Sequence, residues 1–328
     1  MCHLDHSEAR AEWRDLAVGE NITQNSKISP PQNLLRQIFP VEMTHLKTYG
    51  DTVALKKEDF NENQHRPMTN IRKLGSTFDR EAALYHSIRP RYPEVLFDAL
   101  ERVTHLPRPA QLLEIGPGTG QATITLANRD HHITAIEIGP ALAEMARREL
   151  RTFSNVDIIT GAFEDINLPP HSFDLIFAAT SFHWIKPGIA FHKSRYLLKP
   201  DGHLAIIHTH HISDEKGDLF YHASQPIYQK YFPRSTNTKA QLPTATELQS
   251  WKIDEKLFEQ IHFETFPLTI HYTANEYAKL LNTYSPNLRL PANKRECFLR
   301  EIEELINGRF EGILEKYFSL SLTVAKRQ

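Results

Sequence analysis

Three glycines carry the clearest chemical signal in the sequence. Gly116, Gly118 and Gly120 alternate with single residues in LLEIGPGTGQ (112–121), directly after an apolar run. Glycines at a strand-to-helix turn let the backbone approach a ligand closely. A phosphate-binding P-loop is excluded, because no Gly-Lys-Ser/Thr follows the glycines. The dinucleotide pattern G-x-G-x-x-G is not matched either, since its third glycine would fall on Gln121.

Two glutamates narrow the choice of ligand. Glu114 precedes the glycines, where a carboxylate repels a pyrophosphate and attracts a cationic amino group. Glu137 ends the next apolar run, and a carboxylate there can accept hydrogen bonds from both hydroxyls of a ribose. Together these positions indicate a ligand with a nucleoside, no phosphate and a positively charged amino acid end. S-adenosylmethionine (SAM) has these parts.

The elements that position these residues follow from the hydrophobic pattern. Short apolar runs predict five strands, with helices between them, such as the one that Pro140 begins. Nearly continuous apolar strands indicate a parallel sheet that is buried on both faces. A closing pair of strands is expected in the C-terminal part. The predicted strands are 111–115, 133–138, 156–160, 173–178, 203–208, 263–272 and 319–325.

Five stretches follow one another in chain order: LLEIGPGTGQ (112–121), ITAIEIG (133–139), GAFEDINLP (161–169), FDLIFAATSFHW (173–184) and LLKPDGHLAI (197–206). Together they resemble the motifs of class I SAM-dependent methyltransferases, and the resemblance covers residues 76–328. IRPRYP (88–93) and FHW (182–184) are also similar to the type 11 branch of that family, which includes trans-aconitate methyltransferase-like proteins.

The resemblance implies a doubly wound, Rossmann-like α/β fold. Its seven-stranded sheet is mostly parallel, with an antiparallel last strand. We expect one methyltransferase domain over residues 76–328, with a helical cap insertion at about 212–260. The aromatic stretch 219–232 is then either a substrate lid or the core of that cap. Residues 1–75 are polar and rich in Asn, Gln and His, so we expect a poorly packed N-terminal arm.

The resemblance also implies contacts to the amino acid and ribose parts of SAM. Gly116, Gly118 and Gly120 would line the methionine part, with Glu114 near its ammonium group. Glu137 would hold the ribose. The product of the reaction would be S-adenosylhomocysteine.

Four further residues are implied on the adenine and methyl sides of SAM. Ile138 would pack on the adenine, Phe163 would offer its backbone N–H, and Glu164 would accept from the adenine amine. The family often has alanine at the position of Phe163, so the adenine pocket is expected to differ in shape. Thr180, which leaves the fourth strand, would face the methyl group.

The acceptor side offers one candidate catalytic residue and four candidate substrate contacts. His183 would act as a general base if the acceptor must lose a proton, and it would equally serve to bind a loop carbonyl. Arg89 is either a clamp on an anionic substrate or a surface arginine. Trp184 is either a packing anchor or a substrate contact, and Tyr85 and Tyr92 lie beside Arg89 in the chain.

Composition and charge limit the kinds of partner that the protein is expected to have. The net charge of −2 gives no global basic excess, which disfavours nucleic acid, and no apolar run reaches the length of a membrane span. The N-terminus lacks the features of a signal peptide, so we expect a cytoplasmic location. A monomer or a homodimer is expected. HTHH (208–211) is interpreted as ordinary histidines and no metal is expected, because neighbouring strand residues point to opposite faces.

These observations predict SAM-dependent methyl transfer, by in-line displacement, to a small polar or anionic molecule. Two alternatives remain at this stage. One is a nicotinamide-dependent oxidoreductase, which the third-glycine spacing and Glu114 disfavour. The other is a methyltransferase-like protein that binds SAM without catalysis.

Overall fold

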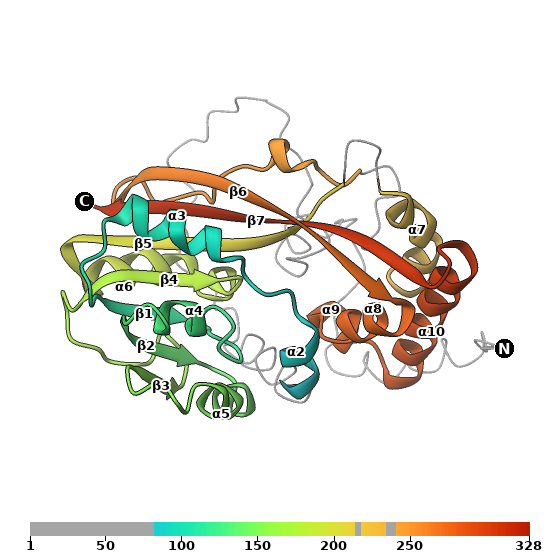
Figure 1. Cartoon of the computed structure of the whole chain (residues 1–328), viewed down its shortest axis with the longest axis horizontal. Coiled ribbons are helices and arrows are strands. Elements are labelled where there is room, and N and C mark those ends of the chain that lie inside the picture. The colour runs from blue at the N-terminus through green and yellow to red at the C-terminus, as the bar shows by residue number, and fades with distance from the viewer. Residues whose placement is uncertain (1–81, 214–217, 234–240) are drawn as a thin grey trace, which may run out of the picture. The chain divides into compact units, whose positions relative to one another are not determined.

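The computed structural model describes residues 82–213, 218–233 and 241–328, which all belong to one compact unit (Figure 1). The predicted arm over residues 1–75 lies outside the described residues, as do residues 76–81 and two short parts of the predicted cap. In the described part, no helix is both long and apolar enough to cross a bilayer.

The sheet has seven strands in the order β3-β2-β1-β4-β5-β7-β6. Strands β1 to β5 run parallel to one another, and β7 is antiparallel to both of its neighbours, which confirms the predicted fold class. The strands are β1 Gln111–Ile115, β2 His132–Glu137, β3 Val156–Thr160, β4 Phe173–Ala179, β5 Leu198–His211, β6 Phe258–Thr273 and β7 Ile313–Arg327.

Helices cover both faces of this sheet, as the apolar strands predict. Leu112 and Phe177 pack with helix α3 on one face, whereas Leu113 and Ile176 pack with helix α6 on the other. Successive residues of a strand point to opposite faces, so a continuous apolar run fills two cores. The helices are α2 Ala82–Ile88, α3 Glu94–Thr104, α4 Thr123–Ala127, α5 Pro140–Glu149, α6 Pro187–Leu197, α7 Leu219–Tyr231, α8 Ala274–Leu281, α9 Ser285–Leu288 and α10 Ala292–Arg309.

The three C-terminal strands of the sheet are longer than the sequence pattern predicts. β6 and β7 continue beyond the parallel core to a group of helices made by α7, α8 and α10 (Figure 1). A third apolar cluster fills that group, with Phe220, Tyr277, Phe298 and Phe318 among its members. Helix α7 therefore belongs to this cluster, together with helices that follow it in the chain.

The predicted turn KPDG (199–202) lies inside β5 instead of before it. Leu198 pairs with Phe173, and the next paired residue of β5 is His203, opposite Leu175. The residues between them bulge out of the ladder, so the turn chemistry of proline and glycine is accommodated as an irregularity within one long strand. The sequence-based expectation of a strand beginning at 203 was wrong for this reason.

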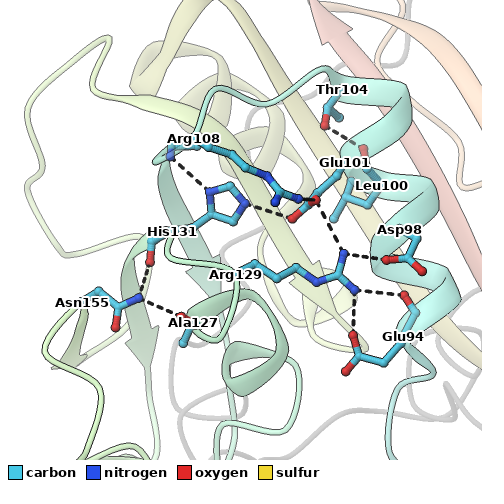
Figure 2. Close-up of polar contacts among 11 residues, drawn as sticks. Glu94, Asp98, Leu100, Glu101, Thr104, Arg108, Ala127, Arg129, His131 and Asn155 are labelled. Carbon is cyan, nitrogen blue, oxygen red and sulfur yellow. Dashed lines mark hydrogen bonds and ion pairs between the residues drawn. The ribbon is translucent and has the colours of Figure 1, made fainter.

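A polar network fixes α3 to the amino ends of β1 and β2 (Figure 2). The buried His131 ring accepts a hydrogen bond from the Ala110 N–H at 3.1 Å, and its Nε2 lies 3.0 Å from Glu101 on α3. Arg129 binds Glu94 at 2.7 Å and Asp98 at 2.8 Å on the same helix. The network lies at the amino ends of the strands. Parallel sheets of this kind bind ligands at the other edge, at the carboxyl ends of the strands.

Candidate active site

A cavity opens at the carboxyl ends of β1, β2 and β4. It contains about 1120 Å³ of space between atoms, with the solvent at its mouth included. The predicted site residues that line it are Tyr85, Arg89, Gly116, Gly118, Glu137, Ile138, Phe163, Glu164, Thr180, His183 and Trp184.

The glycine loop follows β1 and passes close to its neighbours. Gly116 has a φ of +68°, and a Cβ there would lie 2.6 Å from the Cβ of Ser181. Any larger residue would have to displace the segment that leaves β4. Gly118 lies beneath the ring of Tyr85, whereas Gly120 packs on Leu150 and does not line the cavity. Two of the three predicted glycines therefore border the cavity, and the third supports the loop.

Glu137 connects the glycine loop to the end of β2. Its Oε2 accepts a hydrogen bond from the Gly118 N–H at 2.9 Å, and its Oε1 accepts one from the Gly139 N–H at 2.8 Å. The carboxylate lines the cavity and fits the ribose role that the sequence predicts for it.

Glu114 is buried next to the same loop, near the carboxyl end of β1. Thr123 donates a hydrogen bond to its Oε2 at 2.6 Å, while its buried Oε1 has no hydrogen-bond partner in the described part of the chain. Burial, with a smaller contribution from Glu137, raises the pKa of Glu114 to about 8. Glu114 does not line the cavity, although Ile115 and Gly116, which follow it, do. An unpartnered acceptor at this place fits the ammonium group of SAM.

The loop that follows β3 also borders the cavity. Phe163 is buried and Glu164 is half-buried, and both line the cavity. Ile138, just after β2, is 37% exposed and faces the same space. An exposed isoleucine inside a cavity offers a surface for a planar apolar group such as adenine.

The segment that leaves β4 has an unusual backbone. Thr180 has a φ of +60°, a conformation that residues with a Cβ adopt rarely and that is often found at functional sites. Its N–H donates to the Ile207 carbonyl at 2.8 Å, and its hydroxyl lies 3.1 Å from the hydroxyl of Thr209. Ser181 donates to the Ile115 carbonyl. These bonds hold the segment between β1 and β5.

His183 and Trp184 come next, in the short 3-10 helix η3, Phe182–Trp184. The His183 ring lies 4.7 Å from the Trp184 ring and 5.7 Å from the His208 ring, measured between centroids. Burial and the neighbouring His208 lower the pKa of His183 to about 3. His183 is therefore a neutral imidazole at neutral pH, on the wall of the cavity.

Arg89 is held in place by neutral groups. Its Nε and Nη2 donate to the hydroxyl and carbonyl oxygens of Thr283, both at 2.9 Å. Its guanidinium carbon lies 4.8 Å from the centre of the Tyr85 ring and 4.4 Å from the centre of the Tyr284 ring. Among the described residues no carboxylate forms an ion pair with it.

The structure differs in two respects from the substrate contacts that the sequence predicts. Tyr92 does not line the cavity: its hydroxyl lies 3.3 Å from Thr180, and its ring packs on Phe97. Tyr284 and Ser285 do line it, which the sequence reasoning missed. No local pattern marks those two residues, because they reach the cavity from a distant part of the chain.

The HTHH stretch has the predicted geometry. The rings of His208 and His210 lie 4.6 Å apart on one face of β5, whereas His211 packs on Phe318 and Tyr284. His210 Nε2 lies 2.8 Å from the Ser321 hydroxyl. Within the described ranges, no group of three or more His, Cys, Asp or Glu is arranged to hold a metal ion.

This chain is similar in sequence to known methyltransferases. A methyltransferase domain family matches residues 113–206. An uncharacterized methyltransferase-like protein of Schizosaccharomyces pombe is 27% identical over 70% of this chain and 85% of its own. The malonyl-[acyl-carrier protein] O-methyltransferase of Geobacter sulfurreducens is 31% identical over 42% of this chain and 54% of its own.

A solved structure shares the fold. A putative type II methyltransferase from Anaeromyxobacter dehalogenans superposes with a TM-score of 0.52 and 21% identity, over 73% of this chain and 97% of its own. The fold, the motifs and these relatives together support a class I SAM-dependent methyltransferase, a class for which SAM is the cofactor, and they argue against the nicotinamide-dependent alternative.

Proposed function

We propose that this protein transfers the methyl group of SAM to a carboxylate of a small acidic molecule, forming a methyl ester and S-adenosylhomocysteine. The observation that carries the proposal is Arg89. Its guanidinium faces the cavity, is fixed by Thr283 and two aromatic rings, and has no carboxylate counter-ion in the described chain. A buried or half-buried cation of this kind favours an anionic ligand.

The acceptor chemistry follows from the neutral state of His183. SAM, when bound, supplies a methyl group that is already activated by the sulfonium. A carboxylate reaches the cavity without a proton, so it needs no general base, whereas an alcohol or amine acceptor needs one. His183 has a pKa of about 3, because it is buried beside His208, and it is a poor base for such acceptors. In this proposal it shapes the wall and excludes water.

The proposal assigns the two substrates to different residues that line the cavity. Glu137 holds the ribose, Ile138 packs on the adenine, and the loop at Gly116 and Gly118 borders the methionine part. Arg89 binds the acceptor. Holding both reactants in line is what the protein must supply, since proximity and orientation alone account for about 7–11 kcal/mol in well-aligned reactions.

One relative supports an oxygen acceptor. The Geobacter sulfurreducens protein is named as an O-methyltransferase of malonyl-[acyl-carrier protein], and a malonyl group carries a carboxylate. The similarity covers less than half of this chain, so it supports transfer to oxygen but does not identify the acceptor. The experiment below is designed to identify it.

The test is incubation with methyl-labelled SAM and a panel of small mono- and dicarboxylates, each paired with its primary amide. We expect label in base-labile methyl esters of some acids and none in the amides. For an acceptor found in this way, Arg89→Met should raise KM about 100-fold, which is the scale of a lost charge-assisted bidentate pair. Arg89→Lys should restore part of the loss.

The matched control is Arg91→Met, which removes an exposed arginine two positions away that does not line the cavity. We expect its KM for the acceptor to equal that of the wild type. The affinity for S-adenosylhomocysteine should be the same in all these variants. Methyl transfer confined to uncharged acceptors, or an unchanged KM in Arg89→Met, would refute the proposal.

A further inference from the structure

A lysine on α6 binds three backbone carbonyls of the loop that follows β3. The Lys193 ammonium donates to the carbonyl oxygens of Phe163 and Ile166, both at 2.6 Å, and to that of Glu164 at 3.2 Å. It also lies 5.0 Å from the centre of the Phe163 ring. All three donors of the ammonium are therefore used on one turn of backbone.

The hydrogen bonds within this turn use a different acceptor from the three carbonyl oxygens that bind Lys193. The N–H groups of Asp165 and Ile166 both donate to the Ala162 carbonyl, at 2.9 and 3.2 Å. They close the turn but do not involve the carbonyls of residues 163, 164 and 166. In the described chain no carboxylate lies within ion-pair distance of the Lys193 ammonium. The positive charge of Lys193 therefore interacts with backbone carbonyl oxygens and does not form a surface ion pair.

The turn held in this way is part of the cavity wall. The side chains of Phe163 and Glu164 both line the cavity. Lys193 itself does not line it, and it stands on the helix that begins just after His183 and Trp184. One side chain thus connects the segment after β4 to the segment after β3.

We propose that Lys193 is a positioning residue, which holds residues 163–166 in the conformation that receives the adenine ring of SAM. The inference rests on the proposed assignment of the adenine to Phe163 and Glu164. Without the ammonium, three carbonyl dipoles that point at one place repel each other, and among the described residues no other donor binds those three oxygens. The backbone N–H of Phe163 and the carboxylate of Glu164 would then lose their fixed directions.

The test measures ligand affinity and not only turnover. By calorimetry, Lys193→Met should bind S-adenosylhomocysteine about tenfold more weakly than the wild type, and adenosine should weaken by the same factor. The KM of the acceptor at saturating SAM should stay unchanged. Lys193→Arg should recover most of the affinity, because a guanidinium can also donate to several carbonyls.

Lys199→Met is the matched control. Lys199 binds Asp174 at 2.8 Å near the amino end of β4, at the edge of the sheet opposite the cavity. Its removal should lower thermal stability and leave the affinity for S-adenosylhomocysteine unchanged. If Lys193→Met does not fold, Lys193→Gln, which keeps one amide donor, carries the same measurement.

Two further variants separate this inference from the assignment on which it rests. Glu164→Gln and Glu164→Ala should both weaken adenosine binding if the adenine lies on this loop, because each removes the carboxylate that would accept from the adenine amine. Unchanged affinity in both refutes the adenine assignment. Weakened binding in those two variants, with normal affinity in Lys193→Met or Lys193→Gln, overturns the role of Lys193 alone.

Discussion

Glu114 and Glu137 are two carboxylates at the same edge of the sheet with different surroundings. Glu137 accepts hydrogen bonds from two backbone N–H groups and lines the cavity. Glu114 is completely buried, and among the described residues only the Thr123 hydroxyl donates to it. Desolvation disfavours the charged form of an acid, which is why burial raises the pKa of Glu114 to about 8.

This difference predicts proton release on cofactor binding. Near pH 7 the free protein holds Glu114 mostly protonated, because its pKa is about 8. An ammonium group beside it favours the carboxylate and lowers the pKa, so the complex binds fewer protons than the free protein. The affinity for S-adenosylhomocysteine should therefore increase with pH up to about 8, and calorimetry in buffers of different ionisation enthalpy should detect up to one proton released.

Glu114→Gln should bind without proton release, whereas Glu144→Gln should behave as the wild type, because Glu144 is exposed on α5. Equal binding enthalpies of the wild type in all buffers would show that the ammonium group does not ionise Glu114.

Helix α3 shows how an element far from the cavity is held by a few polar groups. His131 accepts from the Ala110 N–H through Nδ1, so its Nε2 carries the proton and donates to Glu101. Burial alone would raise the pKa of Glu101, but the hydrogen bonds from His131 and Arg108 and the charge of Arg129 lower it. Both ends of the imidazole are thus used to bind α3 to the start of β1 (Figure 2).

His131→Phe should destabilise the protein without changing ligand binding. The substitution leaves the buried Ala110 N–H without a partner and removes one donor from Glu101, which should lower the free energy of unfolding by about 2 kcal/mol. Chemical denaturation measures this change, and the affinity for S-adenosylhomocysteine should be unchanged, since the network lies at the opposite edge of the sheet.

Arg102→Met provides the comparison on the same helix. Arg102 is exposed and lies 3.6 Å from Glu264, so its loss should cost less than about 0.5 kcal/mol. Equal destabilisation by the two substitutions would contradict the importance of the buried network.

The molecule as a whole builds its cavity from distant parts of the chain. α2 contributes Tyr85, the segment between α8 and α9 contributes Tyr284, and α9 contributes its first residue, Ser285. Arg89 connects the two, because it binds Thr283 across 194 positions of sequence. The C-terminal helices, with their own apolar cluster, therefore help to form the acceptor side.

A truncation tests the predicted division of the chain into an N-terminal arm and a methyltransferase domain. The residues that we assign to SAM lie between Glu114 and Lys193, so a chain lacking residues 1–67 should bind S-adenosylhomocysteine with an affinity within about twofold of the full chain. Calorimetry on both chains, with circular dichroism to compare folding, measures this. Loss of binding or of folding would show that the N-terminal segment is needed for the methyltransferase domain.

The sequence by itself determined the elements and the class of protein. Its hydrophobic runs predict the bounds of β1 and β3 as the structure has them, and Gly116, Glu114 and Glu137 indicate the kind of cofactor. These features could be predicted because each depends on residues close together in the chain, where turn chemistry and strand periodicity act.

Only the tertiary structure decided which side chains meet. It turned Tyr92 away from the cavity, brought Tyr284 to it, placed Arg89 on Thr283 and Lys193 on the carbonyls of another loop. It also set the burial that makes His183 neutral and raises the pKa of Glu114. Such contacts and charge states depend on how separate elements pack and on how much water remains between them, which no local pattern of residues encodes.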